Sequence, residues 1–209
     1  MTRSPMSEAV ERTLSAKGRA RRDQIIEVAG RLFGQRGYGS VSLRDIATEA
    51  GITHPLLVHY FRSKEELLHA VIESWRERAA RHGLVDAEGY EGLPSRVVEL
   101  AEENAEVPGY IALFAGLSSD AVDAEHPAHE LFLDQYRTVY ESLFAFFRHE
   151  EARGALRYGV DPSVAARSLI ALEDGAQMQW LYHPDEVDVP ELVRAYLELV
   201  LVDPFPARC

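Results

Sequence analysis

Few groups of residues in this sequence have the types and spacing that bond-making chemistry needs. His126 and His129 lie three residues apart beside Glu125 and Glu130, and such a set could bind a metal ion. Histidines at the polar start of a helix more commonly contact solvent, so we expect neither a metal nor a cofactor. The sequence contains no nucleophile elbow, no phosphate-binding glycine loop and no dinucleotide-binding fingerprint. We therefore expect a protein that binds other molecules and is not an enzyme.

A second polar group lies in an otherwise apolar segment. Glu173, Asp174 and Gln177 fall on a predicted helix that is rich in alanine and leucine. Two acids on such a helix are costly to bury unless they are paired. They could bind a cationic ligand, pair with Arg167 or Arg137, or face solvent, and the sequence leaves these three interpretations open.

The elements that would position these groups are helices. Apolar residues recur at spacings of three and four from residue 21 onward, and no segment shows the period-two alternation of a strand. We therefore predict an all-α fold with about nine helices. The first runs from Arg21 to Arg36, and Ser42, Thr53 and Ser63 cap the next three. Five more are predicted near residues 94–106, 108–118, 126–151, 162–182 and 189–202.

The segment from Ser42 to Phe61 has the spacing of a helix-turn-helix. Ser42 can cap the first helix, with Asp45 at its third position, Gly51 supplies the positive backbone dihedral of a tight turn, and Thr53 can cap the second helix. An ordinary pair of helices with a glycine cap would give the same pattern. The motif alone therefore leaves both interpretations open.

Charge and composition divide the chain into three parts. We predict a flexible basic arm at residues 1–18, a helix-turn-helix domain at 19–80 and a larger helical domain at 81–209. The net charge is +6 from Arg12 to Lys64 and −15 from Arg81 onward, within a total of −12. A basic N-terminal part suits a polyanionic partner, although a window of this length also varies by a few charges at random.

Four runs of residues around this motif form one longer pattern: Phe33-Gly34-Gln35-Arg36-Gly37-Tyr38, Val41-Ser42-Leu43-Arg44-Asp45-Ile46-Ala47, Gly51-Ile52-Thr53 and Tyr60-Phe61-Arg62-Ser63-Lys64-Glu65-Glu66-Leu67. This pattern resembles the DNA-binding domain of the TetR family of transcriptional regulators, over about residues 19–75. Residues 94–202 are similar to that family in helical layout and length only.

The resemblance implies how the chain would contact DNA. In the family the third helix enters the major groove, and the starts of the second and fourth helices contact phosphates. By position, Arg44 could donate two hydrogen bonds to guanine, and Pro55 and Leu56 could contact a thymine methyl group. The expected DNA-binding residues are Ser42, Arg44, Thr53, His54, Pro55, Leu56, His59, Tyr60 and Lys64.

One position departs from the family pattern. Where many relatives have a tyrosine that donates to a phosphate, this chain has Val58, which cannot donate. Either His59 and Tyr60 compensate, or the domain docks differently on DNA. Tyr60 could equally be a core aromatic residue whose hydroxyl reaches solvent.

The resemblance also implies an effector pocket in residues 81–209. Aromatic residues are numerous there at helical spacing, a pattern that core packing alone would explain. In this family, however, a pocket lined by aromatic and a few polar side chains holds an apolar ligand. The expected ligand-binding residues are Tyr110, Phe114, Tyr136, Tyr140, Glu173, Asp174 and Gln177.

The last two predicted helices carry apolar residues on more than one face, as expected of helices that pack on their own domain and on a second subunit. We expect a homodimer with Leu197 and Val200 in its interface, bound to a palindromic operator in double-stranded DNA. The single cysteine, Cys209, and the absence of a long apolar stretch or a secretion signal favour the cytoplasm over a membrane.

The favoured function is a repressor that an unidentified small molecule releases from its operator. One alternative is a helix-turn-helix regulator that responds to a protein partner or to no effector. A helical enzyme or carrier with a fortuitous motif is the remote alternative.

Overall fold

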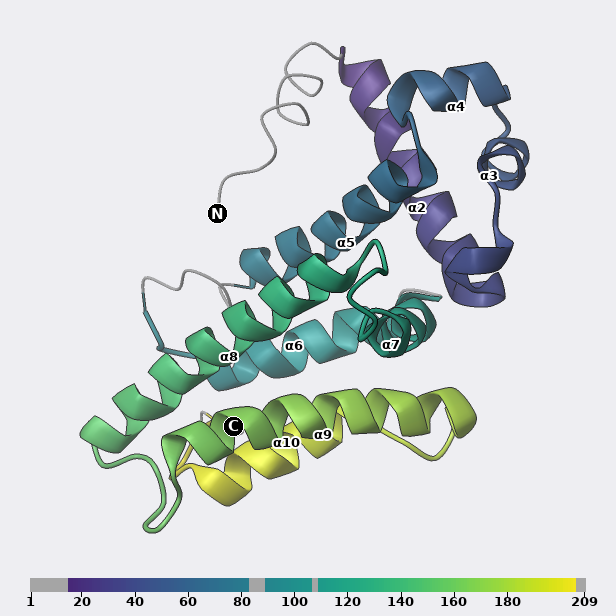
Figure 1. The fold of residues 1–209 in the computed structure, drawn as a ribbon. Coiled ribbons are helices and arrows are strands. Elements are labelled where there is room, and N and C mark those ends of the chain that lie inside the picture. Colours follow the sequence, from purple (N-terminus) through teal and green to yellow (C-terminus); the bar gives the residue numbers. More distant parts are fainter. Residues whose placement is uncertain (1–14, 83–88, 107–108, 206–209) are drawn as a thin grey trace.

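The computed structural model describes residues 15–82, 89–106 and 109–205 of the 209-residue chain. Within these ranges the regular structure is helical, with nine α-helices and one short 3-10 helix, so the predicted all-α fold is confirmed (Figure 1). The elements are α2 (Ala16–Arg36), η1 (Tyr38–Ser40), α3 (Leu43–Glu49), α4 (His54–Tyr60), α5 (Lys64–Arg81), α6 (Leu93–Glu106), α7 (Tyr110–Asp120), α8 (His129–Ala152), α9 (Pro162–Tyr182) and α10 (Val189–Val200).

Two helix starts differ from the prediction. Helix α2 begins at Ala16 because the hydroxyl oxygen of Ser15 accepts a hydrogen bond from the Gly18 amide at 3.2 Å, a cap that apolar spacing does not reveal. Residues 15–18 of the expected arm therefore form the cap and first turn of α2, and residues 1–14 lie outside the described residues. Helix α8 begins at His129, after a series of turns that starts at Ala121.

The helix-turn-helix has the local structure that its residues predict. Gly51 has φ of +63°, and the Ile52 amide then donates to the Ala47 carbonyl at 2.9 Å, which closes the turn between α3 and α4. Ile46 and Leu57 are fully buried between the two helices. This packing fixes the orientation of α4 relative to α3.

Two hydrophobic cores organise the molecule. The first joins α2, α3, α4 and α5 and also includes Leu113 and Leu117 of α7 and Phe132 of α8. This core therefore contains residues from both sides of the domain boundary expected near residue 80. The second joins α6, the C-terminal half of α8, α9 and α10. In Figure 1, α5 leads from the helix-turn-helix end toward α6 and α8. Helices α9 and α10 form the layer farthest from the helix-turn-helix.

The last two helices present a second, exposed apolar face. Leu197 and Val200 are 0% and 7% exposed and pack into the second core of their own chain, so the expectation that they form a subunit interface is wrong. The outward apolar side chains are instead Val164, Met178, Leu181 and Tyr182 of α9 and Leu192 and Leu199 of α10. Because α10 has one face toward α6 and α9, residues two positions apart point to opposite environments.

Candidate functional site

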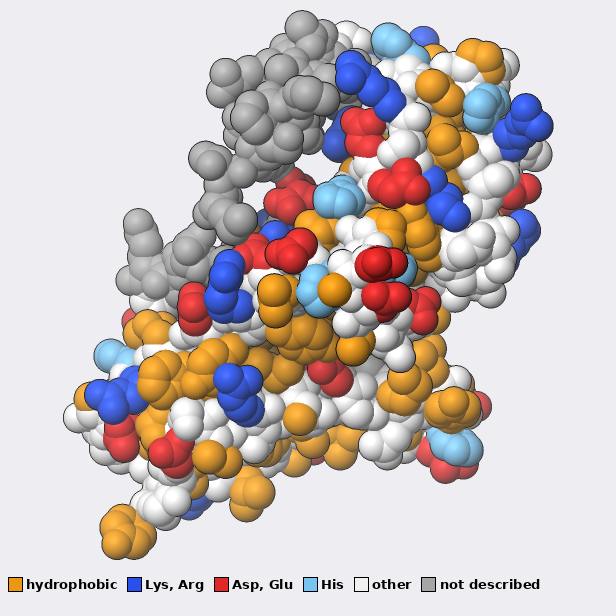
Figure 2. All heavy atoms as spheres, in the orientation of Figure 1, with side chains coloured by type: hydrophobic (Ala, Val, Ile, Leu, Met, Phe, Trp, Pro, Cys, Tyr) orange, Lys and Arg blue, Asp and Glu red, His pale blue; other side chains and the backbone are white. Residues whose placement is uncertain are grey.

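The first candidate site is the surface that α3 and α4 expose at one end of the molecule (Figures 1 and 2). Arg44 on α3 is exposed, as are Pro55, Leu56 and His59 on α4. On the opposite side of α4, Leu57 anchors the helix in the first core. A short helix held by its buried side thus presents a cation and apolar side chains outward, which is the arrangement that groove reading requires.

Ser42 lies at the start of α3 but is not free to bind a phosphate. Its amide donates to the Asp45 carboxylate at 2.8 Å, its hydroxyl donates to the same carboxylate, and its hydroxyl oxygen accepts from the Asp45 amide at 3.3 Å. The Ser42 hydroxyl bond, above all, holds the pKa of Asp45 below its usual range. The expectation of a free amide and hydroxyl at Ser42 is therefore wrong, because the capping box uses both.

Lys64 is turned inward. Its ammonium donates to the carbonyls of Tyr38 and Val41 at 2.9 and 3.1 Å and lies 4.2 Å from the centre of the Tyr38 ring. Val41 directly precedes the cap of α3, so Lys64 ties the start of α5 to the start of α3. Its geometry makes it a positioning residue for the helix-turn-helix.

Lys64→Ala should destabilise the fold by about 1–3 kcal/mol, because two backbone carbonyls lose a charged donor. Binding to all DNA sequences should weaken, while the slope of log affinity against log salt concentration stays as in the wild type. Loss of a phosphate contact would instead lower that slope by about 1. Affinity titrations at four salt concentrations on operator and random DNA distinguish the two roles, and a flattened slope would restore the phosphate assignment.

Three other expected DNA-binding residues lie in or beside α4. The Thr53 hydroxyl oxygen caps the helix by accepting from the Leu56 amide at 3.4 Å. Tyr60 is half-buried against the first core, and its ring meets that of His59 edge-on at 5.5 Å between centroids. His54 is half-buried at the first position of the helix. These contacts favour a structural role for Thr53 and Tyr60.

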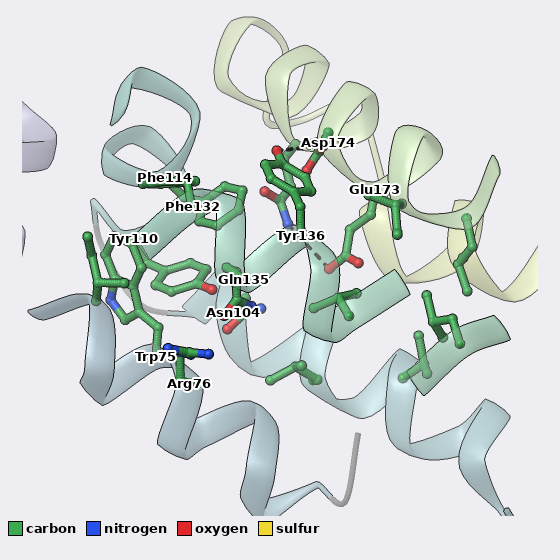
Figure 3. Close-up of a pocket in the computed structure, with 18 residues that line it drawn as sticks. Trp75, Arg76, Asn104, Tyr110, Phe114, Phe132, Gln135, Tyr136, Glu173 and Asp174 are labelled. Carbon is green, nitrogen blue, oxygen red and sulfur yellow. Dashed lines mark hydrogen bonds between the residues drawn. The ribbon is translucent and has the colours of Figure 1, made fainter. Parts of the chain in front are cut away.

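The second candidate site is a cavity of about 110 Å³ that residues of α5, α6, α7, α8 and α9 line (Figure 3). A cavity of about 150 Å³ is known to take up benzene, so this space is somewhat smaller than the volume that holds a single aromatic ring. Six of the seven expected ligand-binding residues line it: Tyr110, Phe114, Tyr136, Glu173, Asp174 and Gln177.

Tyr140 does not line the cavity, so that expectation is wrong. Its ring stacks on that of Phe144 with the two centroids 5.8 Å apart, and the Arg167 guanidinium lies 4.1 Å from the centre of the Tyr140 ring. Tyr140 follows Tyr136 by four residues, but the packing of α8 on α9 turns it toward Arg167. Helical spacing alone could not separate the two tyrosines.

Sequence analysis missed several residues of this cavity. Trp75 and Arg76 come from α5, Asn104 comes from α6, and Phe132 and Gln135 come from α8. Trp75 belongs to an apolar stripe that is typical of ordinary core packing. Asn104 offered a signal in principle, because a polar residue on the inward stripe of an amphipathic helix is uncommon.

The two acids on α9 are half-buried, and neither forms an ion pair with a residue that the structure describes. Asp174 accepts a hydrogen bond from the Tyr136 hydroxyl at 2.9 Å, and Glu173 accepts one from the Gln177 amide nitrogen at 3.4 Å. Burial and then the neighbouring charge of Asp174 raise the pKa of Glu173 to about 7. Burial also raises the pKa of Asp174. The pairing with Arg167 or Arg137 that the sequence left open is absent, since these cations contact Tyr140 and Asp134 respectively.

Glu173→Gln should make the protein more stable at pH 8 by roughly 1–3 kcal/mol, and should leave its stability near pH 4.5 almost unchanged. The folded state binds the Glu173 proton more tightly than the unfolded state, so wild-type stability falls as the pH rises from about 4.5 through about 7. Glutamine stays neutral and removes this loss. Urea unfolding of wild type and variant at both pH values, at one protein concentration, measures the difference in the free energy of unfolding. Glu141→Gln, at an exposed position on α8, is the control. A less stable Glu173→Gln at pH 8 would contradict the assignment.

His126 and His129 contact the backbone. The His126 ring nitrogen accepts from the Ala128 amide at 3.2 Å, and a ring nitrogen of His129 lies 2.8 Å from the Ala121 carbonyl oxygen. Within residues 15–82, 89–106 and 109–205, no group of three histidine, cysteine or acidic side chains has the geometry to hold a metal ion. No helix in the same ranges has the length and apolar character to cross a membrane.

Two family models match parts of this chain. A family model described as bacterial regulatory proteins, tetR family, matches residues 25–71, and one described as the C-terminal part of BetI-type transcriptional repressors matches residues 109–202. The HTH-type transcriptional repressor KstR2 of Rhodococcus jostii (strain RHA1) is 26% identical over 199 residues, which cover 87% of this chain and 89% of KstR2.

Solved structures share the fold. The complex of SmeT, a repressor from Stenotrophomonas maltophilia, with triclosan has a TM-score of 0.71 and 23% identity, covering 90% of this chain and 95% of SmeT. A transcriptional regulator of Saccharomonospora viridis in complex with choline has a TM-score of 0.68 and 22% identity, covering 87% of this chain and 97% of that one.

Proposed function

Because this chain belongs to the TetR family of bacterial regulatory proteins and is a DNA-binding transcriptional regulator, we propose that it represses transcription from a palindromic operator and is released by a small molecule. The observation that carries the proposal is that one helix, α5, packs against the helix-turn-helix and also lines the cavity. Helix α5 continues from the helix-turn-helix, and its Trp75 and Arg76 line the cavity. A ligand there contacts the element that holds the DNA-binding surface.

On the DNA side, Arg44, Pro55, Leu56 and His59 are the exposed candidates for base and phosphate contacts. The positive charge of residues 12–64 supports an approach of this end to DNA, despite the net charge of −12 for the whole chain. A palindromic operator requires two such surfaces. The exposed apolar side chains of α9 and α10 offer a face for a second copy, which would form a four-helix bundle across a twofold axis.

On the effector side, relatives of the same fold hold triclosan and choline. A ligand changes the affinity for DNA only if it prefers one arrangement of the two DNA-binding surfaces, and a preference of about 1–3 kcal/mol lowers that affinity some 5- to 150-fold. A ligand that contacts Trp75 and Arg76 would favour the orientation of α5 in which these contacts form. We infer that release from DNA accompanies a movement of α5.

Arg44→Ala should weaken binding to the operator by about 1–3 kcal/mol and weaken binding to random DNA far less, because a bidentate contact to guanine is specific for one base pair. The operator is sought first in the DNA that flanks the coding region. An equal loss on both DNA sequences would assign Arg44 to the phosphate backbone. Failure of the wild-type protein to prefer any palindrome would overturn the proposed function.

A further inference from the structure

The cavity contains two buried oxygen atoms that have no hydrogen-bond partner. Asn104 on α6 is 4% exposed and Gln177 on α9 is 6% exposed, and the side-chain oxygens of both lack a donor. Both residues line the cavity. A buried acceptor without a partner is costly, and native structures retain few of them. Two such oxygens at one cavity indicate a ligand that donates hydrogen bonds.

The amide of Gln177 has a defined orientation. Its nitrogen donates to the Glu173 carboxylate at 3.4 Å, so the oxygen is the atom that remains without a partner. The neighbouring Asp174 already receives the Tyr136 hydroxyl. In Figure 3 the Glu173 side chain extends from α9 toward the middle of the cavity. One carboxylate and one amide oxygen therefore form an acceptor pair on the α9 side.

The cavity offers little to an anionic ligand. Arg76 is the one Lys or Arg among the described residues that line it, and its guanidinium lies 2.8 Å from Asp134 and 3.9 Å from Glu73. Its charge is thus neutralised by the protein itself. An acid placed beside Glu173 and Asp174 would meet like charges with no free cation from the lining residues to offset them.

The opposite side of the cavity is aromatic. The rings of Trp75 and Tyr110 meet edge-on with their centroids 4.8 Å apart. The centroid of the Phe114 ring lies 5.2 Å from that of Phe132 and 6.5 Å from that of Tyr136 (Figure 3). These rings are tilted against one another and give an apolar surface that one aromatic ring of a ligand can contact edge-on or face-on. With a volume of about 110 Å³, below the roughly 150 Å³ known to hold benzene, the cavity must widen for any aromatic ligand, and a single ring with a short chain requires less widening than a polycyclic molecule.

Resting on the proposed function, we propose that the effector is a protonated primary or secondary amine on a short chain with one aromatic ring. Its ring lies on the Trp75–Tyr110–Phe114 side, and its N–H groups donate to Glu173, Gln177 and Asn104. The ammonium balances a carboxylate that burial makes costly to ionise. Its two or three N–H donors also satisfy the acceptors that the protein leaves open.

This class excludes the quaternary ammonium group that choline carries. A trimethylated nitrogen has the positive charge and can contact aromatic rings, but it has no N–H. It would bury both amide oxygens without a donor. The regulator of Saccharomonospora viridis binds choline, so the proposal predicts a different head-group preference for this chain.

The test is isothermal titration of the full-length protein with four matched probes: 2-phenylethylamine, its N,N,N-trimethylammonium analogue, 2-phenylethanol and 3-phenylpropionate. The primary amine should bind at least about tenfold more tightly than the trimethyl analogue, since hydrogen bonds to a charged group are worth about that factor or more. The alcohol should bind more weakly than the amine. The carboxylate should give no measurable heat.

Variants assign the preference to named atoms. Gln177→Leu and Asn104→Leu should each reduce the advantage of the primary amine over the trimethyl analogue several-fold, and Glu173→Gln should weaken both cations. Glu141→Gln removes an exposed acid of α8 and should change neither. Thermal melting of each variant without ligand shows that it is folded. An unchanged preference in both leucine variants would overturn the assignment.

The outcomes separate this inference from the proposed function. Equal or tighter binding of the trimethyl analogue, binding of the alcohol alone, or no binding of 2-phenylethylamine overturns the inference. In each of these cases the proposed function still stands if another small aromatic molecule, for example triclosan, raises the melting temperature and releases the protein from its operator. If no molecule of a mixed panel of cations, neutral aromatics and acids does either, the effector part of the proposed function fails as well.

Discussion

Leu199→Asp should convert the protein into a folded monomer and lower its affinity for a palindromic operator by about 100-fold or more, because one half-site offers too few contacts. Leu199 is 71% exposed on α10, and Leu192 lies seven residues earlier on the same face. Val164 and Met178 form the corresponding stripe on α9. A carboxylate on this apolar surface would be buried without a partner in the dimer.

The matched control is two residues away. Leu197 is fully buried in the second core, so Leu197→Asp should unfold the domain, with a loss of about 4–5 kcal/mol or more. Sedimentation velocity, circular dichroism and operator titration separate the two variants. A Leu199→Asp protein that still sediments as a dimer would show that the exposed faces of α9 and α10 are not the subunit interface.

Gly34→Ala should disturb the packing of α2 against α7. A Cβ at Gly34 of α2 would lie 2.3 Å from the carbonyl oxygen of Gly109, which caps α7 with φ of +79°. The atoms of Gly109 that the Cβ would meet belong to the backbone and cannot rotate away, so α2 and α7 must separate. We expect a loss of about 1–3 kcal/mol in stability, as for other overpacked positions. Since Tyr110 and Phe114 of α7 line the cavity, the effector should also release the variant from DNA less effectively.

Gly116→Ala is the control for this substitution. Gly116 lies on α7, and a Cβ at this position would meet no neighbouring element within 4 Å. Alanine there should raise stability by about 0.5–1 kcal/mol through helix propensity. Thermal melting and the effector concentration needed for half-release give both readouts. If Gly34→Ala melts and responds to the effector as the wild type does, the contact between α2 and α7 has no part in coupling.

The local elements follow from residue types that act over a few positions. Ser42 and Asp45 form a capping box, Gly51 adopts the positive φ of the turn, and Thr53 caps α4, as their spacing predicts. Helix ends, turns and amphipathic faces depend on neighbours three or four residues apart. The all-α fold and the family therefore could be inferred from the chain before any tertiary contact was known.

What only the tertiary structure decided is the direction in which each side chain of these helices points. Lys64 lies at the predicted helix start, yet its ammonium is bound by two carbonyls of the segment before α3. Tyr136 lines the cavity and Tyr140 does not, although they are one helical turn apart. Asn104 enters the cavity from a helix that lies far from Gln177 in sequence. Helical periodicity identifies an apolar face but not the element that will cover it, because that depends on how helices distant in the chain pack together.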